Sequence, residues 1–347
     1  MNKKLFKYVF RIQLNSTFFI SVSVFCLILI FDLAEMGRKY PASNVEETLF
    51  LIKLSLLRSP STFCEILHYV YFVTATFSLW TMCRSHQITI LKSIGRSPQQ
   101  ILYPFLSFAA FLAMLWLFAI HPAGLLLEEK YYANKSLNTS CEVTGGIWID
   151  CPRNKRIIFI KNIYGNKIDG LSIFDHASKE KIFAKTAQIA DDMWTLKNAV
   201  IIGKNDKITN IDSLEFSPYI SRDLIELLSK NPRKRDIYKL YKVHRIQKKD
   251  KVSLRLYEME LHKLLANCFS FFLFALMAAT ICFPINRYKT KINIAIKVIS
   301  SAIFVRFFNS ALEFISYEGT IPVQFACWAL MLILSCISIA LLIWREA

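Results

Sequence analysis

Long uncharged stretches recur along the chain and predict its architecture. Each contains 18 residues or more, and about 20 helical residues cross the apolar core of a bilayer. They are Ile12–Phe31, Ile66–Cys83, Ser97–Leu127, Leu264–Asn286 and Gly319–Trp344. A sixth apolar stretch, Ile292–Ile315, carries Lys297, Arg306 and Glu313. This stretch could instead be a buried helix of a soluble core. Because five other predicted spans accompany it, we interpret it as a sixth span whose polar groups face other helices.

Between the third and fourth spans the hydrophobic period changes. Short β-branched segments follow one another there, at Arg156–Ile163, Leu171–Asp175, Trp194–Gly203 and Ile208–Phe216. Strands spaced by 8–12 residues with turn signals between them predict a β-sandwich or an open roll. From Tyr238 to Ala266 the period is helical, and this basic amphipathic segment suits a membrane surface or a solvated connecting helix.

The predicted fold class is therefore an α-helical integral membrane protein with six transmembrane helices, arranged 3+3 around an inserted β-domain. We expect three spans in residues 1–127, with a short helix near 84–96. The β-domain and its connecting segment occupy residues 128–256, and the last three spans occupy residues 257–347. Asp32 and the "AEMGRK" that follows the first span do not resemble a cleavage site, so we expect this span to be retained.

Basic residues in the short loops predict the orientation. The segments 1–11, 84–96 and 287–297 contain four, three and four Lys or Arg residues and no acidic residue. Such loops stay on the cytosolic side. Both termini and the 84–96 loop are then cytosolic, and residues 128–263 lie outside the membrane on the opposite side.

The formal net charge of +17 says less about function than the loop charges say about orientation. Residues 128–263 hold 26 of the 43 Lys and Arg residues, against 18 acidic residues. This excess indicates either a surface that attracts anions or a gene of biased base composition. Nucleic-acid binding is disfavoured, because most of this charge would face away from the cytosol.

The chain carries no motif for chemistry of its own. It has no phosphate-binding loop, no dinucleotide fingerprint and no nucleophile elbow, and its six histidines are scattered. We therefore expect no catalytic, cofactor or metal site. Most of the nine cysteines lie in or beside spans and suit small apolar fillers. Cys141 and Cys151 alone lie in the inserted domain, where an oxidising compartment would allow a disulfide, although their spacing leaves the bond open.

The stretch "RSHQITILKSIGRSPQQIL" (Arg84–Leu102) predicts a short amphipathic helix between two spans. Ile88, Leu91 and Ile94 recur at i, i+3 and i+6, Gly95 stops the helix, and Ser97-Pro98 starts the next one. Such a helix is either a simple interfacial turn or a coupling helix that docks on a cytosolic ATPase.

The same stretch resembles the "SELxxxRAxGxSP" signature of the LptF/LptG permeases, which export lipopolysaccharide. The resemblance extends along nearly the whole chain. Four further segments resemble the family in the same order: "FDLAEMGRK" (Phe31–Lys39), "SPSTFCEILHYVYF" (Ser59–Phe72), "YEMELHKLLA" (Tyr257–Ala266) and "TIPVQFACWA" (Thr320–Ala329). "GGIWI", "LSIFD" and "KIFAKTAQIADDMWTLKNAVI" resemble strands of the family's periplasmic β-jellyroll. The end of the first span is closer to the LptG half.

This resemblance implies an inner-membrane permease subunit that extracts lipopolysaccharide and passes it to a periplasmic bridge toward the outer membrane. The implied partners are a cytosolic ABC ATPase dimer (LptB-like), a second permease (LptF-like), bridge proteins (LptC/LptA-like) and an anionic glycolipid. The chain itself would be no enzyme. The residues implied for ATPase coupling are Arg84, Gln87, Ile88, Leu91 and Gly95.

Several positions depart from the family pattern. Gln87 stands where the family usually has Glu, so a charge-assisted contact with an ATPase arginine would become a weaker neutral hydrogen bond. His68 replaces a Pro that is frequent near the start of the second span, and Leu264 and Cys268 replace an Arg and a Pro. These departures put the strength of coupling and the identity of the lipid in question.

Two groups of polar or charged residues in the spans are further candidates for function. Arg38 and Lys39 end the first span and suit a phosphorylated headgroup, or they snorkel toward the interface. Arg306, Asn309 and Glu313 share one helical face inside the span region, where such polar groups face the bundle interior and serve function, proton coupling included, or form an Arg306–Glu313 structural pair.

Two other functions stay open on the sequence. One is a permease-like subunit for another lipid or for a lipoprotein. The other is a membrane-anchored binding protein that transports nothing.

Overall fold

The computed structural model describes residues 3–40, 44–95, 97–136, 147–151, 156–164, 167–175, 180–190, 193–203, 208–217, 236–250, 255–283 and 291–344. The chain forms two compact units. The first unit joins Met1–Asn138 to His262–Ala347, and the second comprises Thr139–Leu261. The predicted insertion of one domain between two groups of spans is therefore confirmed.

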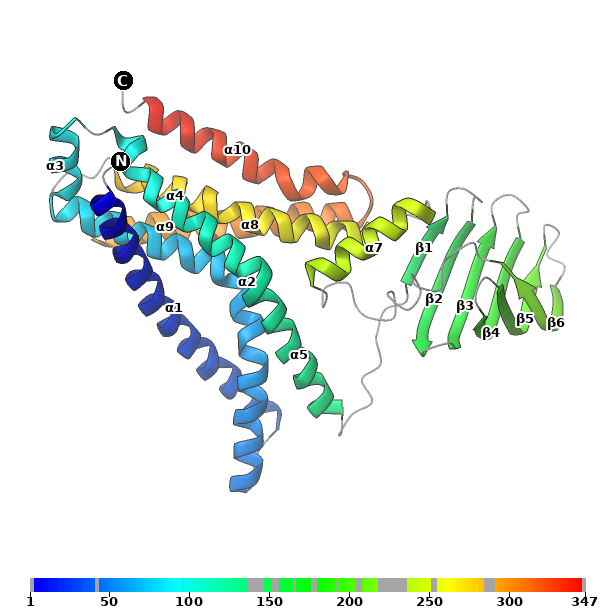
Figure 1. Cartoon of the computed structure of the whole chain (residues 1–347). Coiled ribbons are helices and arrows are strands. Elements are labelled where there is room, and N and C mark those ends of the chain that lie inside the picture. The colour runs from blue at the N-terminus through cyan, green and yellow to red at the C-terminus, as the bar shows by residue number, and fades with distance from the viewer. Residues whose placement is uncertain are drawn as a thin grey trace. The chain divides into compact units, whose positions relative to one another are not determined.

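The first unit is a helical bundle. Among the described residues, six helices are long and apolar enough to cross a membrane, as predicted. Figure 1 shows both chain ends and the short helix α3 at the same end of this bundle. We call this the α3 end, and the opposite end the far end. Five of these spans are single helices, α1 (Lys3–Lys39), α2 (Val45–Arg84), α8 (Arg255–Cys282), α9 (Lys291–Tyr317) and α10 (Val323–Trp344). The third span has three parts, and the short helix α3 (Gln87–Ser93) precedes it.

The third span is interrupted by a π-helical turn. It begins as α4 (Pro98–Leu115), widens at η1 (Trp116–Ile120) and continues as α5 (His121–Ser136). The side chain of Ser97 caps α4 by accepting a hydrogen bond from the backbone N–H of Gln100 (3.3 Å). The span thus continues beyond residue 127, where we expected the inserted domain to begin.

The centre of the bundle is packed with aromatic side chains from α2 and α8. Tyr71, Phe72, Phe271 and Phe274 are all fully buried. The Tyr71 hydroxyl donates to the backbone carbonyl of Phe105 in α4 (3.0 Å), which satisfies the one polar atom of that ring. Helices α2, α4 and α8 therefore form the interior of the bundle.

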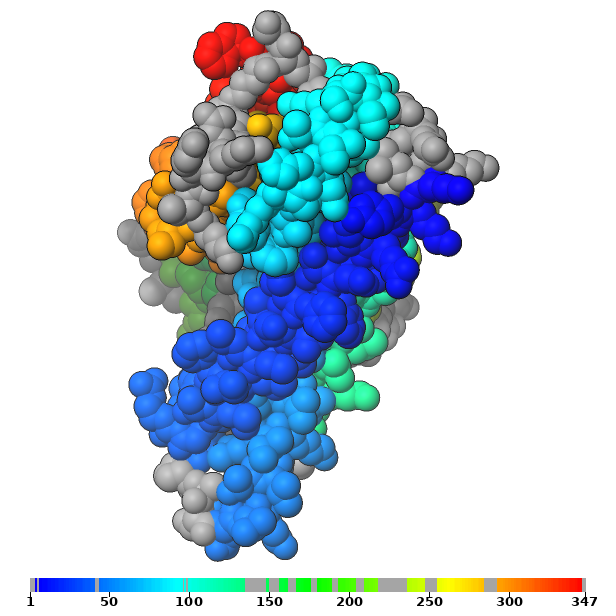
Figure 2. Space-filling model, turned by 90° about the vertical axis from the view of Figure 1, so that its left-hand side faces the viewer, coloured from blue at the N-terminus to red at the C-terminus, as the bar shows by residue number. Residues whose placement is uncertain are grey.

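Helices α1 and α9 lie at the surface of this bundle. Of the 18-residue apolar segment in each of these helices, only 11% is buried, against 61% in α2. Figure 2 shows α1, in dark blue, exposed along its length across one face of the molecule. A chain on its own leaves these two helices mostly uncovered.

The second unit contains an antiparallel sheet. Its strands are β1 (Ile147–Cys151), β2 (Arg156–Tyr164), β3 (Lys167–Asp175), β4 (Glu180–Ala190), β5 (Met193–Ile202) and β6 (Ile208–Phe216). They pair in consecutive order as one meander. The strands predicted near residues 156, 171, 194 and 208 are confirmed as β2, β3, β5 and β6.

One face of the sheet is apolar and buried, as strand alternation requires. Ile158, Ile173 and Leu196 on three strands are at most 1% exposed. The opposite face carries Trp148 against Phe159, with ring centroids 4.6 Å apart. After the sheet, the predicted helical period corresponds to α7 (Ile237–Asp250) and the start of α8.

Candidate functional site

Helix α3 is a short projection between the second and third spans. Two residues in left-handed backbone conformation bound it, His86 before it (φ 59°) and Gly95 after it (φ 83°). Glycine adopts this conformation readily, whereas His86 does so at some cost in energy. The stop predicted at Gly95 is present, because the Gly95 N–H bonds the carbonyl of Lys92 (2.9 Å).

The inner side of α3 is fixed to the bundle. Gln87 donates from Nε2 to the Tyr8 hydroxyl of α1 (3.1 Å). Ile88 is only 5% exposed. The ammonium of Lys92 lies 5.7 Å from the ring centroid of Phe283, beside the end of α8. In the surface view α3, in cyan, lies next to the dark blue start of α1 (Figure 2).

The outer side of α3 presents a different apolar pair. Ile90 and Ile94 are 56% and 69% exposed and lie one turn apart, at i and i+4. Of the residues that the resemblance implied for coupling, Ile88 is buried, Leu91 is half-buried and Gly95 is exposed. The Arg84 guanidinium lies 5.6 Å from the ring centroid of Trp80. The pattern of the sequence thus located the helix, and the structure identifies its accessible face.

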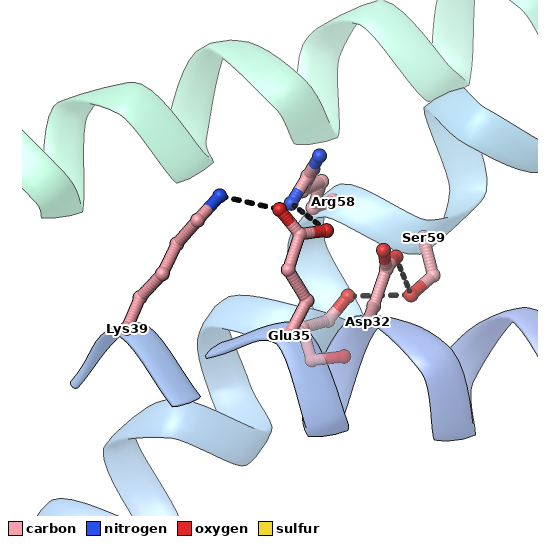
Figure 3. Close-up of polar contacts among 6 residues, drawn as sticks. Asp32, Glu35, Lys39, Arg58 and Ser59 are labelled. Atoms are coloured by element: carbon pink, nitrogen blue, oxygen red, sulfur yellow. Dashed lines mark hydrogen bonds and ion pairs between the residues drawn. The ribbon is translucent and has the colours of Figure 1, made fainter. Parts of the chain in front are cut away.

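A polar cluster joins α1 and α2 at the far end of the bundle (Figure 3). Asp32, only 7% exposed, accepts a hydrogen bond from the Ser59 hydroxyl (2.8 Å). One turn further, Glu35 pairs with Arg58 of α2 (3.3 Å) and with Lys39 of its own helix. Sequence reasoning singled out Lys39 but missed Asp32, Glu35 and Arg58 as its companions.

The candidate Arg38 lies beside this cluster on α1. Its side chain is exposed, and so is Lys39, whose side chain is 53% exposed. Glu35 and Asp32 are instead turned toward α2. The end of α1 therefore keeps its acids inside the helix pair and its bases outside.

A second polar group connects α2, α8 and α9 inside the span region. Glu313 of α9 pairs with Lys263 of α8 (2.9 Å). The positive charge of Arg306 lies within electrostatic reach of the Tyr69 hydroxyl of α2. Glu313 is thus paired across helices, with Lys263. Asn309, the third predicted residue on this face, is half-buried.

His68 lies next to this group on α2. It is 3% exposed, and its ring stacks on Phe274 with centroids 6.0 Å apart and an interplanar angle of 10°. Its Nδ1 atom has no hydrogen-bond partner among the described residues. The departure from proline therefore places a buried aromatic ring between α2 and α8.

The disulfide left open between Cys141 and Cys151 involves side chains that lie outside the described part of the structure. Cys141 lies outside the described ranges, and of Cys151 only the backbone, at the end of β1, is described. Within those ranges no group of three or more His, Cys, Asp or Glu residues could hold a metal ion.

Comparison with known proteins gives one match over nearly the full length. The family model described as "Lipopolysaccharide export system permease LptF/LptG" matches residues 7–344. No curated protein matches the chain. The family match spans both groups of spans and the inserted sheet, as the resemblance in the sequence implied. The chain therefore belongs to the LptF/LptG family of lipopolysaccharide export permeases.

Proposed function

We propose that this chain is one permease subunit of an ABC transporter that extracts lipopolysaccharide from the inner membrane and delivers it toward the outer membrane. In this proposal the α3 end and both termini are cytosolic, and the sheet unit is periplasmic. A separate ATPase dimer supplies the energy, because the sequence has no phosphate-binding loop. The observation that carries the proposal is the family match over residues 7–344.

The exposed face of α3 supports docking of a cytosolic ATPase. Ile90 and Ile94 project side by side from a helix whose inner face is held by Gln87 and Ile88. Two exposed isoleucines suit an apolar groove on a partner, and Lys92 and Arg84 add positive charge nearby. Because Gln87 bonds Tyr8, we assign it to holding α3 on α1 rather than to direct contact with the ATPase.

The uncovered spans support pairing with a second permease. Arg306 lies near the middle of α9 and is exposed in the isolated chain. A charge that faces hydrocarbon at that depth is unfavourable by about 2.5–3.5 kcal/mol. A second permease packed against α1 and α9 would cover these helices and enclose Arg306 in a polar cavity between the subunits.

The basic residues support an anionic lipid as the cargo. Arg306 in the span region, and Arg38 and Lys39 at the far end of α1, are all exposed in the single chain. A guanidinium binds phosphate oxygens in bidentate fashion. We assign these three residues to successive contacts with the phosphorylated headgroup.

Capture of partners from solubilised native membranes tests the proposal. The wild-type chain should retain an ABC ATPase and a second six-span permease, and mass spectrometry should find lipopolysaccharide in the complex. Ile90→Asp with Ile94→Asp should release the ATPase but keep the permease, because only the exposed face of α3 changes. Met193→Asp, a matched change at a residue 43% exposed in the sheet unit, should release neither.

Two results would redirect the proposal. A bound lipid without saccharide would favour a related permease for another cargo. A chain that captures neither ATPase nor permease in several mild detergents would favour a binding protein without transport.

A further inference from the structure

The far ends of three helices form a small unit with its own core. We call Asp32–Lys39 of α1, Val45–Ser59 of α2 and Gly124–Ser136 of α5 the far-end unit. Its core residues, one from each helix, are 2–4% exposed, and they are Met36, Leu54 and Tyr131. The cluster in Figure 3 adds a polar seam between α1 and α2. These segments are therefore built to keep their mutual arrangement.

Two helix interruptions lie side by side where this unit joins the rest of the bundle. Pro60 stands inside α2, and Pro122 follows the π-helical turn of the third span. A proline removes one helical hydrogen bond, and both prolines and π-turns are recognised causes of kinks. Gly124 marks the contact, because a Cβ atom there would lie 2.9 Å from Cys64 Sγ. Pro60 and the π-helical turn, which we call the two bend points, therefore lie at the same height in the bundle.

Two hydrogen bonds connect the bend points across the helices. The indole N–H of Trp116 donates to the backbone carbonyl of Cys64 (2.9 Å), and the Cys64 thiol donates to the carbonyl of Ile120 (3.3 Å). Trp116 is 1% exposed and Cys64 is 4% exposed. Both bonds end on backbone atoms at a bend, so a change in either bend angle would stretch them.

Helix α1 has no such interruption. It runs from Lys3 to Lys39 without a proline and, at 1.5 Å per residue, is about 55 Å long. Its far end is fastened to α2 by Asp32–Ser59, directly before Pro60. Its other end accepts the hydrogen bond from Gln87 of α3 at Tyr8. A displacement at either end is thus carried to the other.

We infer that α1 is a lever between α3 and the far-end unit, and that this unit turns about a hinge formed by Pro60 and the π-helical turn, with Trp116 and Cys64 as its latch. The inference rests on the proposed function only for the source of movement, which is the ATPase that docks on α3. The hinge itself belongs to the isolated chain. A turn of about 20° at Pro60 displaces Leu49, eleven residues away, by about 6 Å.

Distances between spin labels test the hinge in the full-length chain alone, in nanodiscs. Labels on a ketone-bearing amino acid at Leu49 and at Ile303 avoid the native cysteines, and both positions are more than half exposed. Pro60→Ala with Pro122→Ala should narrow the distance distribution, and Trp116→Phe should shift it by several ångströms. Pro104→Ala, in the third span but away from the bend, should leave it unchanged. A distribution unaffected by both hinge and latch variants would overturn the hinge.

A second measurement tests the lever with the captured ATPase and ATP plus vanadate. The nucleotide should shift the Leu49–Ile303 distance in the wild type, and Tyr8→Phe should reduce that shift by half or more. Tyr103→Phe, an exposed tyrosine on α4, is the matched control. An equal shift in Tyr8→Phe would overturn the lever. Failure of the chain to bind any ATPase would refute the proposed function, whereas the hinge would still be decided by the first measurement.

Discussion

Removing either partner of the Lys263–Glu313 pair should destabilise the helical bundle. The pair joins α8 to α9 at 2.9 Å, and α9 is otherwise little buried. Glu313→Gln leaves the ammonium of Lys263 without this carboxylate. Lys263→Met leaves the carboxylate without its ammonium.

The size of the effect follows from how far water reaches the pair. Breaking a fully buried pair costs about 3–5 kcal/mol, whereas an exposed pair contributes about 0.2–1 kcal/mol. The two side chains are 27% and 19% exposed, which lies nearer the buried limit. We expect each single substitution to lower the free energy of unfolding by about 2–3 kcal/mol. The double variant should be less destabilised than the sum by about 2 kcal/mol, because neither charge is then left alone.

Reversible unfolding in mixed micelles, followed by tryptophan fluorescence, measures these differences as a double-mutant cycle. The matched control is Lys39→Met, which removes only the exposed pair with Glu35 inside α1 and keeps Glu35–Arg58, so it should leave the unfolding midpoint unchanged within error. If the Lys263 and Glu313 effects simply add, the two residues do not stabilise each other and the reasoning fails. It also fails if the control costs as much as Glu313→Gln.

Three further substitutions test other parts of the structure. Gly124→Ala should destabilise the bundle by steric overlap at the 2.9 Å contact, and adding Cys64→Ala should restore most of the loss, as thermal unfolding of the double variant would show. Ser59→Ala should lower the free energy of unfolding by about 1–3 kcal/mol, because Asp32 is only 7% exposed and loses its donor; equal stability to the wild type would contradict this. Gly170→Ala should cost the sheet at least about 1 kcal/mol, since φ is +72° and the added Cβ would lie 2.8 Å from the Cβ of Lys161 on the neighbouring strand β2; circular dichroism during chemical unfolding measures it.

The spans and most strands could be predicted from the sequence because both depend on a period that the chain itself displays. The limits of α3 could also be predicted, since Gly95 stops the helix and Ser97 caps the next one. The side of α3 that faces the bundle could not be predicted from the sequence. Ile88 and Ile90 are both isoleucines near the start of one short helix, and only contacts with distant residues such as Tyr8 decide which of them is covered.

The polar groups were harder to predict for the same reason. Spacing on one helix offered Arg306 as a partner for Glu313, yet the nearer cation is Lys263, fifty positions earlier in the sequence. Likewise the pattern near Lys39 gave no signal that Arg58 of the next helix would approach Glu35. Side chains that meet across helices depend on helix rotation and tilt, which a hydrophobic pattern specifies only coarsely.

The weak burial of α9 has a consequence for the lifetime of the protein in the cell. Its mean hydropathy of 1.5 is well below the 2.6 of α10, and it carries Arg306 on an exposed face. In a single chain Arg306 is exposed, and a charge that faces hydrocarbon near the middle of a span costs about 2.5–3.5 kcal/mol. We expect such a helix to be less stably inserted in the unassembled chain than in a complex that covers Arg306. One arginine would thus make the stability of the inserted subunit depend on its assembly, and we expect unassembled copies to have the shorter lifetime.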